Sequence, residues 1–515
     1  MKNKKSISKN YILNLIYQIF LLVTPIITAP YLSRVLGANA IGQFNFTNSI
    51  NTYFIIFAAL GFGYYAQREI ARYQDDKAKQ SAVFWEILIV RFISVGISLT
   101  IFLLLGFLHI YGEYTPLMWW WVISIIAVEF DISFLFQGNE DFQTIVLRNV
   151  LIKTLFIICI FVFVKSNKDL WIYILCSASG SLLGGLSLWL KLPKIISFVP
   201  VRGLHPKHHI VPALRLFIPT LAVSVYTILD KTLIGLLVPG TYVEQETQII
   251  DGVTQTVSVT KRYSDLENGY YSEAEQIVKM AMTVVTSLGT VMIPRNSKEF
   301  SNHRLDNIQK NISFASNFVW FLGVPMCLGI AAVAPNFIPW FLGSDFNKAA
   351  LLMQIFSPLI LIIGFSNLLG LQYLIPSGRD GKFTICILIG AVTNLILNCI
   401  FIPRYWSLGA VVASIIAECL VTGSMFFVVR KEISFGGTLK QAPKKLICGA
   451  MMFAAVYATQ FFLKSVWYNT LILIFEGIII YFGLMLLLRD DFLFVLLELL
   501  KKRLQKFKRN KTSKN

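Results

Sequence analysis

The chain has 515 residues, of which 56% are hydrophobic and only 14% are charged, so an ordinary soluble domain is excluded. Its formal net charge of +18 would suggest a nucleic-acid partner in a soluble protein. The excess basic residues flank apolar segments, however, where membrane topology and anionic lipids explain them. We therefore expect contacts with membrane lipids and no nucleic-acid partner. The seven cysteines lack a metal-like C-x-x-C spacing, and we expect no metal or other cofactor.

Long apolar segments follow one another along almost the whole chain. A hydrocarbon core about 30 Å thick needs roughly 20 helical residues per crossing. The sequence therefore predicts an all-α polytopic membrane protein with about 14 transmembrane helices. In chain order, the predicted spans are 11–32, 43–66, 83–110, 117–136, 144–164, 170–190, 215–238, 274–293, 312–334, 349–375, 383–402, 407–429, 446–464 and 471–488.

Lysine and arginine gather in every second connection between these segments. Examples are the connections 68–79, 191–207, 295–310 and 430–445. Because cytoplasmic loops carry the excess of positive charge, this alternation predicts a plasma-membrane protein with both termini in the cytoplasm. The basic amino terminus before the first span resembles a signal peptide, but the apolar run is too long and no cleavage site follows it. We expect a retained first helix.

Two segments outside the predicted spans have their own patterns. Segment 239–273 is rich in Thr, Val, Gln and Glu and contains an Asp251-Gly252 turn, which predicts a β-hairpin on the extracellular side. The basic tail 490–515 alternates apolar runs with Lys and Arg as far as about residue 508. A helix on the inner leaflet and a solubilising charged tail both explain that alternation.

An internal repeat relates the two halves of the chain. Residues 32–37 at the end of the first span correspond to 229–235 in the seventh, and Phe136-Gln137-Gly138 corresponds to Pro376-Ser377-Gly378. Six helices separate each pair, as in transporters built from parallel repeats. The predicted domains are an N-terminal six-helix bundle 1–214, a C-terminal six-helix bundle 215–445 with the hairpin insertion 239–273, two extra helices 446–489, and the cytoplasmic tail 490–515.

Several short segments also resemble a known family, and they are spread over the chain. They are 31–37, 131–142, 229–231, 390–398 followed by Ile402-Pro403, Leu408-Gly409-Ala410, and Ala417-Glu418. Their order and spacing resemble the polysaccharide transporter family of the multidrug/oligosaccharidyl-lipid/polysaccharide exporter superfamily. The hairpin 239–273 departs from the short connection usual in that family.

This resemblance implies a flippase rather than an enzyme. Such a flippase moves undecaprenyl-diphosphate-linked oligosaccharide repeat units across the bacterial cytoplasmic membrane for capsule, O-antigen or related polysaccharide assembly, by alternating access between two bundles. The resemblance implies polysaccharide polymerase machinery as a candidate partner, and we expect a monomer. A lipid II flippase and a multidrug or small-cation exporter of the same superfamily remain alternatives. The cavity of a small-cation exporter should favour carboxylates over cations.

Basic residues inside the predicted spans are the candidate ligands of the diphosphate, because a charge within a membrane is costly and often functional. They form an inner tier and an outer tier along the spans. Snorkelling to the lipid headgroups is the competing explanation, most of all for the residues near span ends. The candidates are Arg34, Arg91, Arg148, Lys231 and Lys279, with Lys153 as a further member of the inner tier.

Acidic residues inside the spans are candidates for binding a coupling proton or sodium ion. From these we select Asp131, Asp230 and Glu418. Asp131 is preferred over Glu129 because it belongs to a segment that resembles the family, and the two residues point to different helix faces. A structural salt bridge is the alternative for Asp230. Sugar stacking or a membrane-interface belt explains the aromatic run Trp119-Trp120-Trp121.

Overall fold

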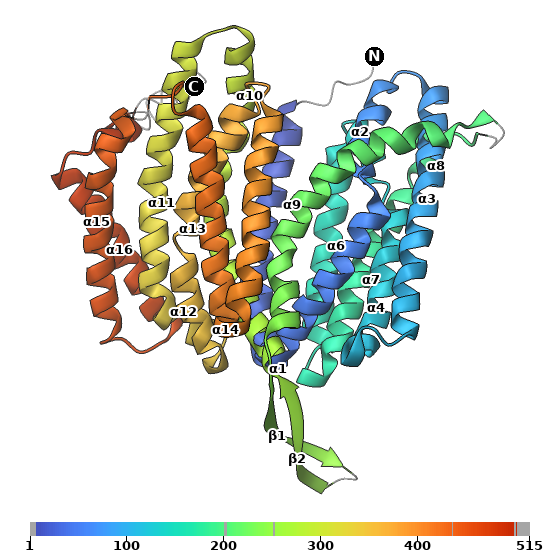
Figure 1. Ribbon diagram of the computed structural model, residues 1–515, viewed down its shortest axis with the longest axis horizontal. Helices are drawn as coiled ribbons and strands as arrows, with labels where there is room; N and C mark the ends of the chain where they lie inside the picture. The colour runs from blue at the N-terminus through green and yellow to red at the C-terminus, as the bar shows by residue number, and fades with distance from the viewer. Residues whose placement is uncertain (1–6, 200–202, 251–252, 435, 499–500, 502–515) are drawn as a thin grey trace, which may run out of the picture. The chain divides into compact units, whose positions relative to one another are not determined.

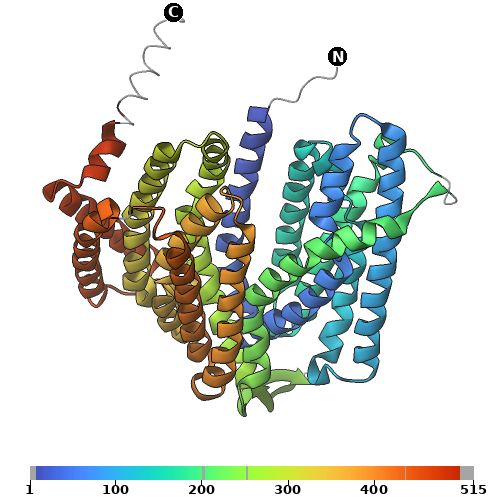
Figure 2. The same cartoon turned by 45° about the horizontal axis from the view of Figure 1, so that its top comes forward.

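The computed structural model describes residues 7–199, 203–250, 253–434, 436–498 and 501. The described chain is almost entirely helical, with one two-stranded hairpin (Figures 1 and 2). Contacts divide it into two compact units. Unit 1 comprises residues 1–272 with 402–406, and unit 2 comprises 273–401 with 407–515. The predicted all-α polytopic class is confirmed.

Unit 1 is built mainly from the first nine α-helices. Its elements are α1 (Ile7–Ala59), α2 (Phe62–Arg72), α3 (Lys77–Phe107), η1 (Gly112–Tyr114), α4 (Thr115–Phe130), α5 (Ser133–Gly138), α6 (Phe142–Phe163), η2 (Asn167–Asp169), α7 (Leu170–Trp189), α8 (Leu192–Ile195), η4 (Pro206–His209) and α9 (Ile210–Leu237). Within this unit α1 packs against α3, α4, α6 and α9, and α4 packs against α7.

Unit 2 is assembled around one long helix, α11. Its elements are α10 (Tyr263–Ser301, whose first residues belong to unit 1), α11 (Leu305–Phe341), η5 (Ser344–Phe346), α12 (Asn347–Phe356), α13 (Leu359–Leu369), the π-helical turn η6 (Gly370–Leu374), α14 (Asp380–Val429), α15 (Gly436–Gln460) and α16 (Trp467–Leu487). Helix α11 packs against α12, α13, α15 and α16, and α15 packs against α16.

The predicted spans correspond to these helices. Among the described residues, nine helices are long and apolar enough to cross a membrane, and a bent pair, Ser344–Phe356 with Leu359–Leu374, makes up to ten. Helix α14 contains two predicted spans, and α1 contains the first span and most of the second, whose end lies in α2. Non-helical backbone separates the two spans at Gly37 in α1 and at Trp406 in α14. Gly37 has φ 75°, which a residue without Cβ adopts readily. The exact number of crossings stays a prediction.

The predicted hairpin is present but shorter than expected. Strand β1 (Thr241–Ile250) pairs with β2 (Val253–Arg262) in antiparallel register, from Thr241 opposite Arg262 to Ile250 opposite Val253. The turn residues 251 and 252 lie outside the described residues. Helix α10 begins at Tyr263, so the last part of the predicted hairpin segment is helical. Figure 1 shows the strands projecting beyond the helices, at the end of unit 1 opposite to the start of α1. The extracellular placement stays a prediction.

The predicted domains, with their first boundary at residue 214, stay a prediction, and the compact units divide the chain in another way. Helix α9 packs on α1 and α2 and therefore lies in unit 1, although the repeat places it at the start of the second bundle. The repeat itself stays a prediction. Helices α15 and α16, which cover most of the predicted segment 446–489, pack on α11 in unit 2.

The start of the predicted tail 490–515 is attached to unit 2. Phe492 and Leu493 lie buried in an apolar cluster with residues of α11, α15 and α16. Asp490 accepts hydrogen bonds from the backbone N–H groups of both residues and pairs with the buried Lys445 at 3.1 Å. Most of the tail beyond residue 498 lies outside the described residues.

Candidate functional site

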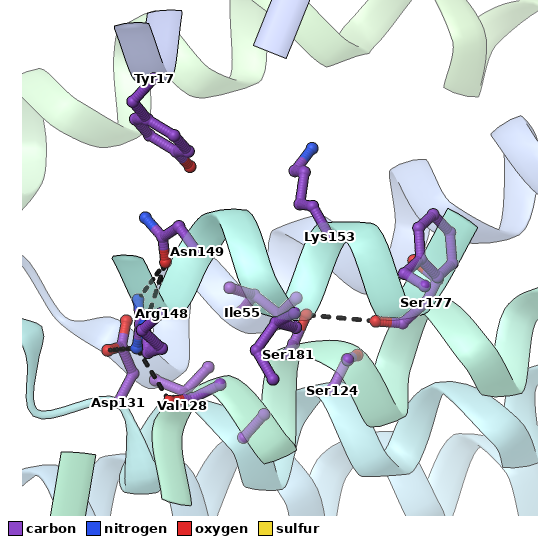
Figure 3. A pocket seen from close by; sticks show the side chains of 15 residues that line it. Tyr17, Ile55, Ser124, Val128, Asp131, Arg148, Asn149, Lys153, Ser177 and Ser181 are labelled. Carbon is purple, nitrogen blue, oxygen red and sulfur yellow. Dashed lines mark hydrogen bonds and ion pairs between the residues drawn. The ribbon is translucent and has the colours of Figure 1, made fainter. Parts of the chain in front are cut away.

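A polar cavity of about 420 Å³ lies within unit 1 between α1, α4, α6 and α7 (Figure 3). Each of these helices is largely apolar, so the polar side chains that face this space are exceptions in their own segments. The lining residues are Tyr17, Ile55, Ser124, Ala127, Val128, Asp131, Arg148, Asn149, Ile152, Lys153, Phe156, Ser177, Gly180, Ser181 and Gly184.

Arg148 on α6 is the most firmly held cation of this cavity. Its Nη1 donates to the backbone carbonyl of Gly184 at 3.0 Å, and its Nε and Nη2 donate to Asn149 Oδ1 at 3.0 and 2.6 Å. Asp131 Oδ1 lies 3.6 Å from Nη1, too far for a good hydrogen bond. Only 14% of the Arg148 side chain is exposed, against 51% for Asp131. The guanidinium is therefore fixed by neutral oxygen atoms, and its charge is balanced only loosely.

Asp131 lies where the fourth predicted span is interrupted. Helix α4 ends at Phe130, and Asp131 adopts an extended backbone conformation before α5 begins at Ser133. The Asp131 carboxylate accepts hydrogen bonds from the backbone N–H of Ser133 at 3.1 Å and from its hydroxyl. The carboxylate thus satisfies donors at the start of α5, as a capping side chain does.

A glycine on α7 allows the close approach of that helix to this break. A Cβ at Gly185 would lie 2.9 Å from the backbone carbonyl carbon and oxygen of Phe130, which is closer than a real Cβ contact. The neighbouring Gly184 supplies the carbonyl that holds Arg148. The two glycines therefore bring α7, the break after α4 and the arginine of α6 together.

Arg91 has different partners from Arg148. It is 4% exposed and donates to the backbone carbonyls of Asp131, at 3.0 Å, and Val128. Its guanidinium also lies over the Phe134 ring, 5.4 Å from the ring centroid. These carbonyls are at the end of α4, where intrahelical donors run out; the Val128 carbonyl also accepts from the Asp131 backbone N–H at 3.3 Å. Arg91 does not line the cavity, and its predicted role in substrate binding stays a prediction.

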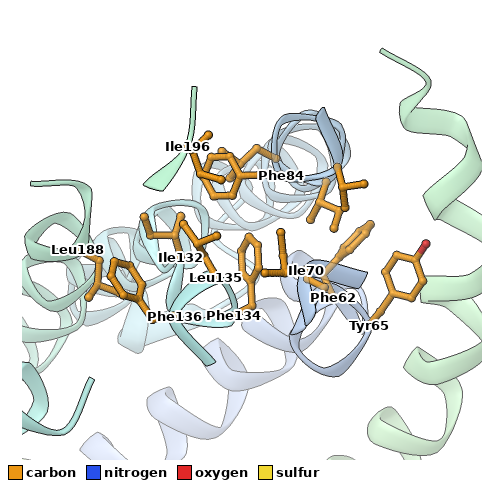
Figure 4. Close-up of a cluster of buried hydrophobic side chains, with 14 of the residues drawn as sticks. Phe62, Tyr65, Ile70, Phe84, Ile132, Phe134, Leu135, Phe136, Leu188 and Ile196 are labelled. Atoms are coloured by element: carbon orange, nitrogen blue, oxygen red, sulfur yellow. The ribbon is translucent and has the colours of Figure 1, made fainter. Parts of the chain in front are cut away.

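A buried apolar cluster supports the break from the other side (Figure 4). Ile132, Leu135 and Phe136 pack with Phe84 of α3 and Ile70 of α2. Close to this cluster, a Cβ at Gly138 would lie 2.7 Å from Ile70 Cγ2. The segment Phe136-Gln137-Gly138, which carried part of the family resemblance, therefore anchors α5 on α2 rather than lining the cavity.

Lys153 provides a second cation, and the remaining polar lining comes from neutral groups. Lys153 follows Arg148 on α6, is half-buried and lines the cavity. Figure 3 shows the Tyr17 hydroxyl facing Asn149, while Ser177 and Ser181 approach from α7. Ser181 donates to the carbonyl of Ser177 at 3.3 Å. The lining thus combines two cations and one carboxylate with hydroxyl and amide groups.

The other predicted site residues lie elsewhere. Arg34, on α1, is exposed and donates to the Pro30 carbonyl at 3.3 Å. On α9, Asp230 is buried and accepts a hydrogen bond from Tyr271, and Lys231 is half-buried. In unit 2, Lys279 pairs with Glu275 at 2.6 Å, and Glu418 is half-buried. Their roles in diphosphate binding and ion coupling stay predictions, as does that of Asp131.

Sequence reasoning missed the neutral part of the cavity. Tyr17, Asn149, Ser177 and Ser181 are uncharged, so no charge marks them within apolar segments. One signal was available: on α7 the small residues Ser177, Gly180, Ser181 and Gly184 recur every three or four positions, which indicates a helix face that permits close approach.

The chain is similar in sequence to known proteins of polysaccharide biosynthesis. A family model described as "Polysaccharide biosynthesis protein" matches residues 7–300, which is more than half of the chain. The chain belongs to this family. A protein of Escherichia coli (strain K12) named "Putative O-antigen transporter" is 24% identical over 437 residues, covering 84% of this chain and 98% of its own length. A protein of the same name from Shigella dysenteriae is 23% identical and covers 79% of this chain and 96% of its own length.

Two solved structures show the fold of this family member. The inward closed conformation of the lipid II flippase MurJ superposes with a TM-score of 0.73 at 17% identity, covering 93% of this chain and 99% of that one. An inward-facing multidrug resistance MATE transporter of the MOP superfamily superposes with a TM-score of 0.61 at 14% identity. The superposition covers 81% of this chain and 94% of that one. The predicted resemblance to the polysaccharide transporter family is confirmed, and both structures share the fold of this chain. The chain is a multi-pass membrane protein of a polysaccharide biosynthesis family.

Proposed function

We propose that the protein is a flippase that moves undecaprenyl-diphosphate-linked oligosaccharide repeat units across the bacterial cytoplasmic membrane by alternating access, for O-antigen, capsule or a related polysaccharide. The observation that carries the proposal is the polar cavity of unit 1, whose lining contains two cations, Arg148 and Lys153, and one carboxylate, Asp131. The family and the named relatives supply the biological context.

A diphosphate needs such a cavity because a charged group cannot enter hydrocarbon without large desolvation costs. An arginine guanidinium matches the geometry of phosphate oxygen atoms and donates several hydrogen bonds at once. In this cavity Asn149 and Gly184 hold the Arg148 guanidinium in place before any ligand arrives. A phosphate oxygen can approach the Arg148 guanidinium on the side where the Asp131 carboxylate lies 3.6 Å from Nη1. Lys153 supplies a second point charge.

Unit 2 has an apolar cavity that suits the other end of such a substrate. It has a volume of about 490 Å³ and is lined almost entirely by hydrocarbon side chains from α10, α11, α12, α15 and α16. Among its lining residues are Met326, Val333, Leu473 and Ile478. A polyprenyl chain has the same character, and its transfer from lipid into such a space carries little penalty.

The balance of charge in the polar cavity argues against a small-cation exporter, whose cavity should favour carboxylates. A lipid II flippase stays an alternative because lipid II also carries a diphosphate, and the likeness to MurJ concerns the fold. The two flippase functions differ in the lipid that accumulates when the protein is missing.

The test uses a strain that lacks the gene. We expect lipid-linked oligosaccharide to accumulate on the inner leaflet, wild-type protein to clear it, and Arg148→Ala to leave it there at normal protein levels. Arg72→Ala is the matched control, because Arg72 is an exposed residue of α2 that pairs with Glu69 and lies away from the cavity. Accumulation of lipid II instead of the oligosaccharide would select the alternative. Normal clearance by Arg148→Ala would refute the assignment of the cavity.

A further inference from the structure

A row of aromatic rings continues from the cationic part of the cavity. Phe156 on α6 lines the cavity, and its ring stacks on Tyr173 of α7, with centroids 6.1 Å apart and planes inclined by 26°. The ring centroid of Tyr173 lies 4.3 Å from that of Phe44 of α1, and the Phe44 centroid lies 5.4 Å from that of Trp121 of α4. All four helices that enclose the cavity therefore contribute one ring each.

The four rings of this row differ in burial. Trp121 is fully buried, and its Nε1 donates to Thr47 Oγ1 at 3.1 Å. Phe44, Phe156 and Tyr173 are only half-buried. Here the buried indole fixes the row, and Phe156 faces the cavity.

The surroundings of Phe156 combine apolar ring surface with hydroxyl groups. Ser177, one turn after Tyr173 on α7, also lines the cavity, and Figure 3 shows Lys153 between Arg148 and Ser177. A pyranose ring needs this combination, because its C–H face is apolar while its edge carries hydroxyl groups. Binding sites for small polar molecules generally join aromatic walls with a few placed polar groups.

The spacing from the cations fits a sugar that follows a phosphate. Phe156 comes eight residues after Arg148, which corresponds to about 12 Å along the helix at 1.5 Å per residue. Lys153 lies between them. A ligand with its diphosphate at Arg148 and Lys153 would therefore present its next group at Phe156, on which the Tyr173 ring stacks.

We infer that Phe156 and Tyr173 form the subsite for the sugar residue attached directly to the diphosphate. The inference rests on the proposed function and adds the part of the substrate that unit 1 recognises beyond its charge. It also makes Phe156 a specificity-determining residue, because a ring-binding face discriminates glycosylated from bare lipid diphosphate.

The experiment compares two probes bound to the purified full-length protein in detergent. One probe is undecaprenyl diphosphate without sugar, and the other is the lipid-linked oligosaccharide extracted from the strain that lacks the gene. We expect Phe156→Leu, which keeps apolar volume without the ring, to weaken binding of the glycosylated probe about tenfold and leave the bare probe unchanged. Phe156→Tyr should bind both probes normally, and Arg148→Ala should weaken both.

The control is Phe92→Leu, because Phe92 on α3 is 69% exposed and does not line the cavity. It should bind both probes as the wild type does. Equal binding of the glycosylated probe by the wild type and Phe156→Leu, or an equal loss for both probes, would overturn the sugar subsite. Failure of the wild-type protein to bind either probe would instead overturn the proposed function. Tyr173→Leu gives a second, independent measurement if Phe156→Leu is not recovered in folded form.

Discussion

The two cavities differ in chemistry far more than in size. The cavity in unit 1 has about 420 Å³ and the one in unit 2 about 490 Å³. Side chains of Arg148, Lys153 and Asp131 line the first, whereas the described residues that line the second include no charged one. Both are enclosed by apolar helices, so overall hydropathy does not separate them. The difference lies in a few polar residues, most of them on α6 and α7. Under the proposed function, the first space suits a charged headgroup and the second suits hydrocarbon.

A cation placed in the apolar cavity should have the largest effect. Leu473 on α16 is fully buried and lines that cavity. Leu473→Arg buries a charge without a partner, which costs several kcal/mol, and we expect the protein to be lost from the membrane. Ser181→Arg places the same side chain in the polar cavity, where the position is exposed, and should be tolerated. Quantitative blotting of membranes measures both, and equal levels would remove the distinction between the cavities.

Loss of Arg91 should destabilise the protein, whereas loss of Arg148 should not. Arg91→Ala leaves the carbonyl of Asp131 without the Arg91 donor and the carbonyl of Val128 with only the Asp131 backbone N–H. We expect a loss of about 2 kcal/mol in the free energy of unfolding. Arg148→Ala should unfold at the wild-type temperature, because the partly open cavity lets water replace the guanidinium. Thermal unfolding in detergent separates the two. An unchanged unfolding temperature for Arg91→Ala would show that the cap on α4 contributes little.

A methyl group at Gly185 should have an intermediate effect. Its Cβ would lie 2.9 Å from backbone atoms of Phe130, so α7 has to move away from the break that carries Asp131, at a cost of about 1 to 3 kcal/mol. Gly180→Ala is the matched control on the same helix, since its Cβ would make an ordinary 3.8 Å contact with Ile152 Cγ2. The temperature of thermal unfolding should be lowered only for Gly185→Ala. Equal behaviour of the two variants would contradict the tight approach.

The smallest effect is expected at an ion pair outside the helices of unit 2. Glu432 accepts hydrogen bonds from both Nη atoms of Arg379, at 2.7 and 2.6 Å, and these hold the pKa of the Glu432 carboxyl below its ordinary value. A lowered pKa in the folded protein stabilises it above the unfolded-state pKa of about 4.3, and this contribution is lost as the pH falls through the folded-state value. Glu432→Gln should therefore unfold slightly earlier than wild type at pH 7, and the difference should shrink towards pH 3. A difference independent of pH would exclude this ion pair as its cause.

The sequence was sufficient for the fold class because it depends on segment length and apolarity, which are local properties. The hairpin was also predictable, since alternating residues around Asp251-Gly252 specify it without help from the rest of the chain. The end of the hairpin at Arg262 was not predictable, because the following residues are mostly polar and their helix is stabilised by packing within unit 1.

The site was only partly predictable, because a charge in an apolar segment does not reveal which neighbour it meets. Arg91 and Arg148 look alike in the sequence, yet one donates to the end of α4 and the other lines the cavity. The difference arises from the break at Asp131 and the approach of α7 at Gly185, which join residues from separate helices. Tyr17 and Asn149 carried no charge to mark them, and only the folded chain brings them to the same space.

Photo-cross-linking from the two cavities tests the central claim most directly. A photoreactive amino acid is placed at Ser181 in the polar cavity and, separately, at Ile478 in the apolar one, and the protein is illuminated with the lipid-linked oligosaccharide bound. Mass spectrometry of the adducts then identifies which part of the lipid each position has captured. Our account predicts a diphosphate-sugar fragment at Ser181 and a polyprenyl fragment at Ile478. Polyprenyl fragments at Ser181, or no adduct there while Ile478 captures the headgroup, would contradict it.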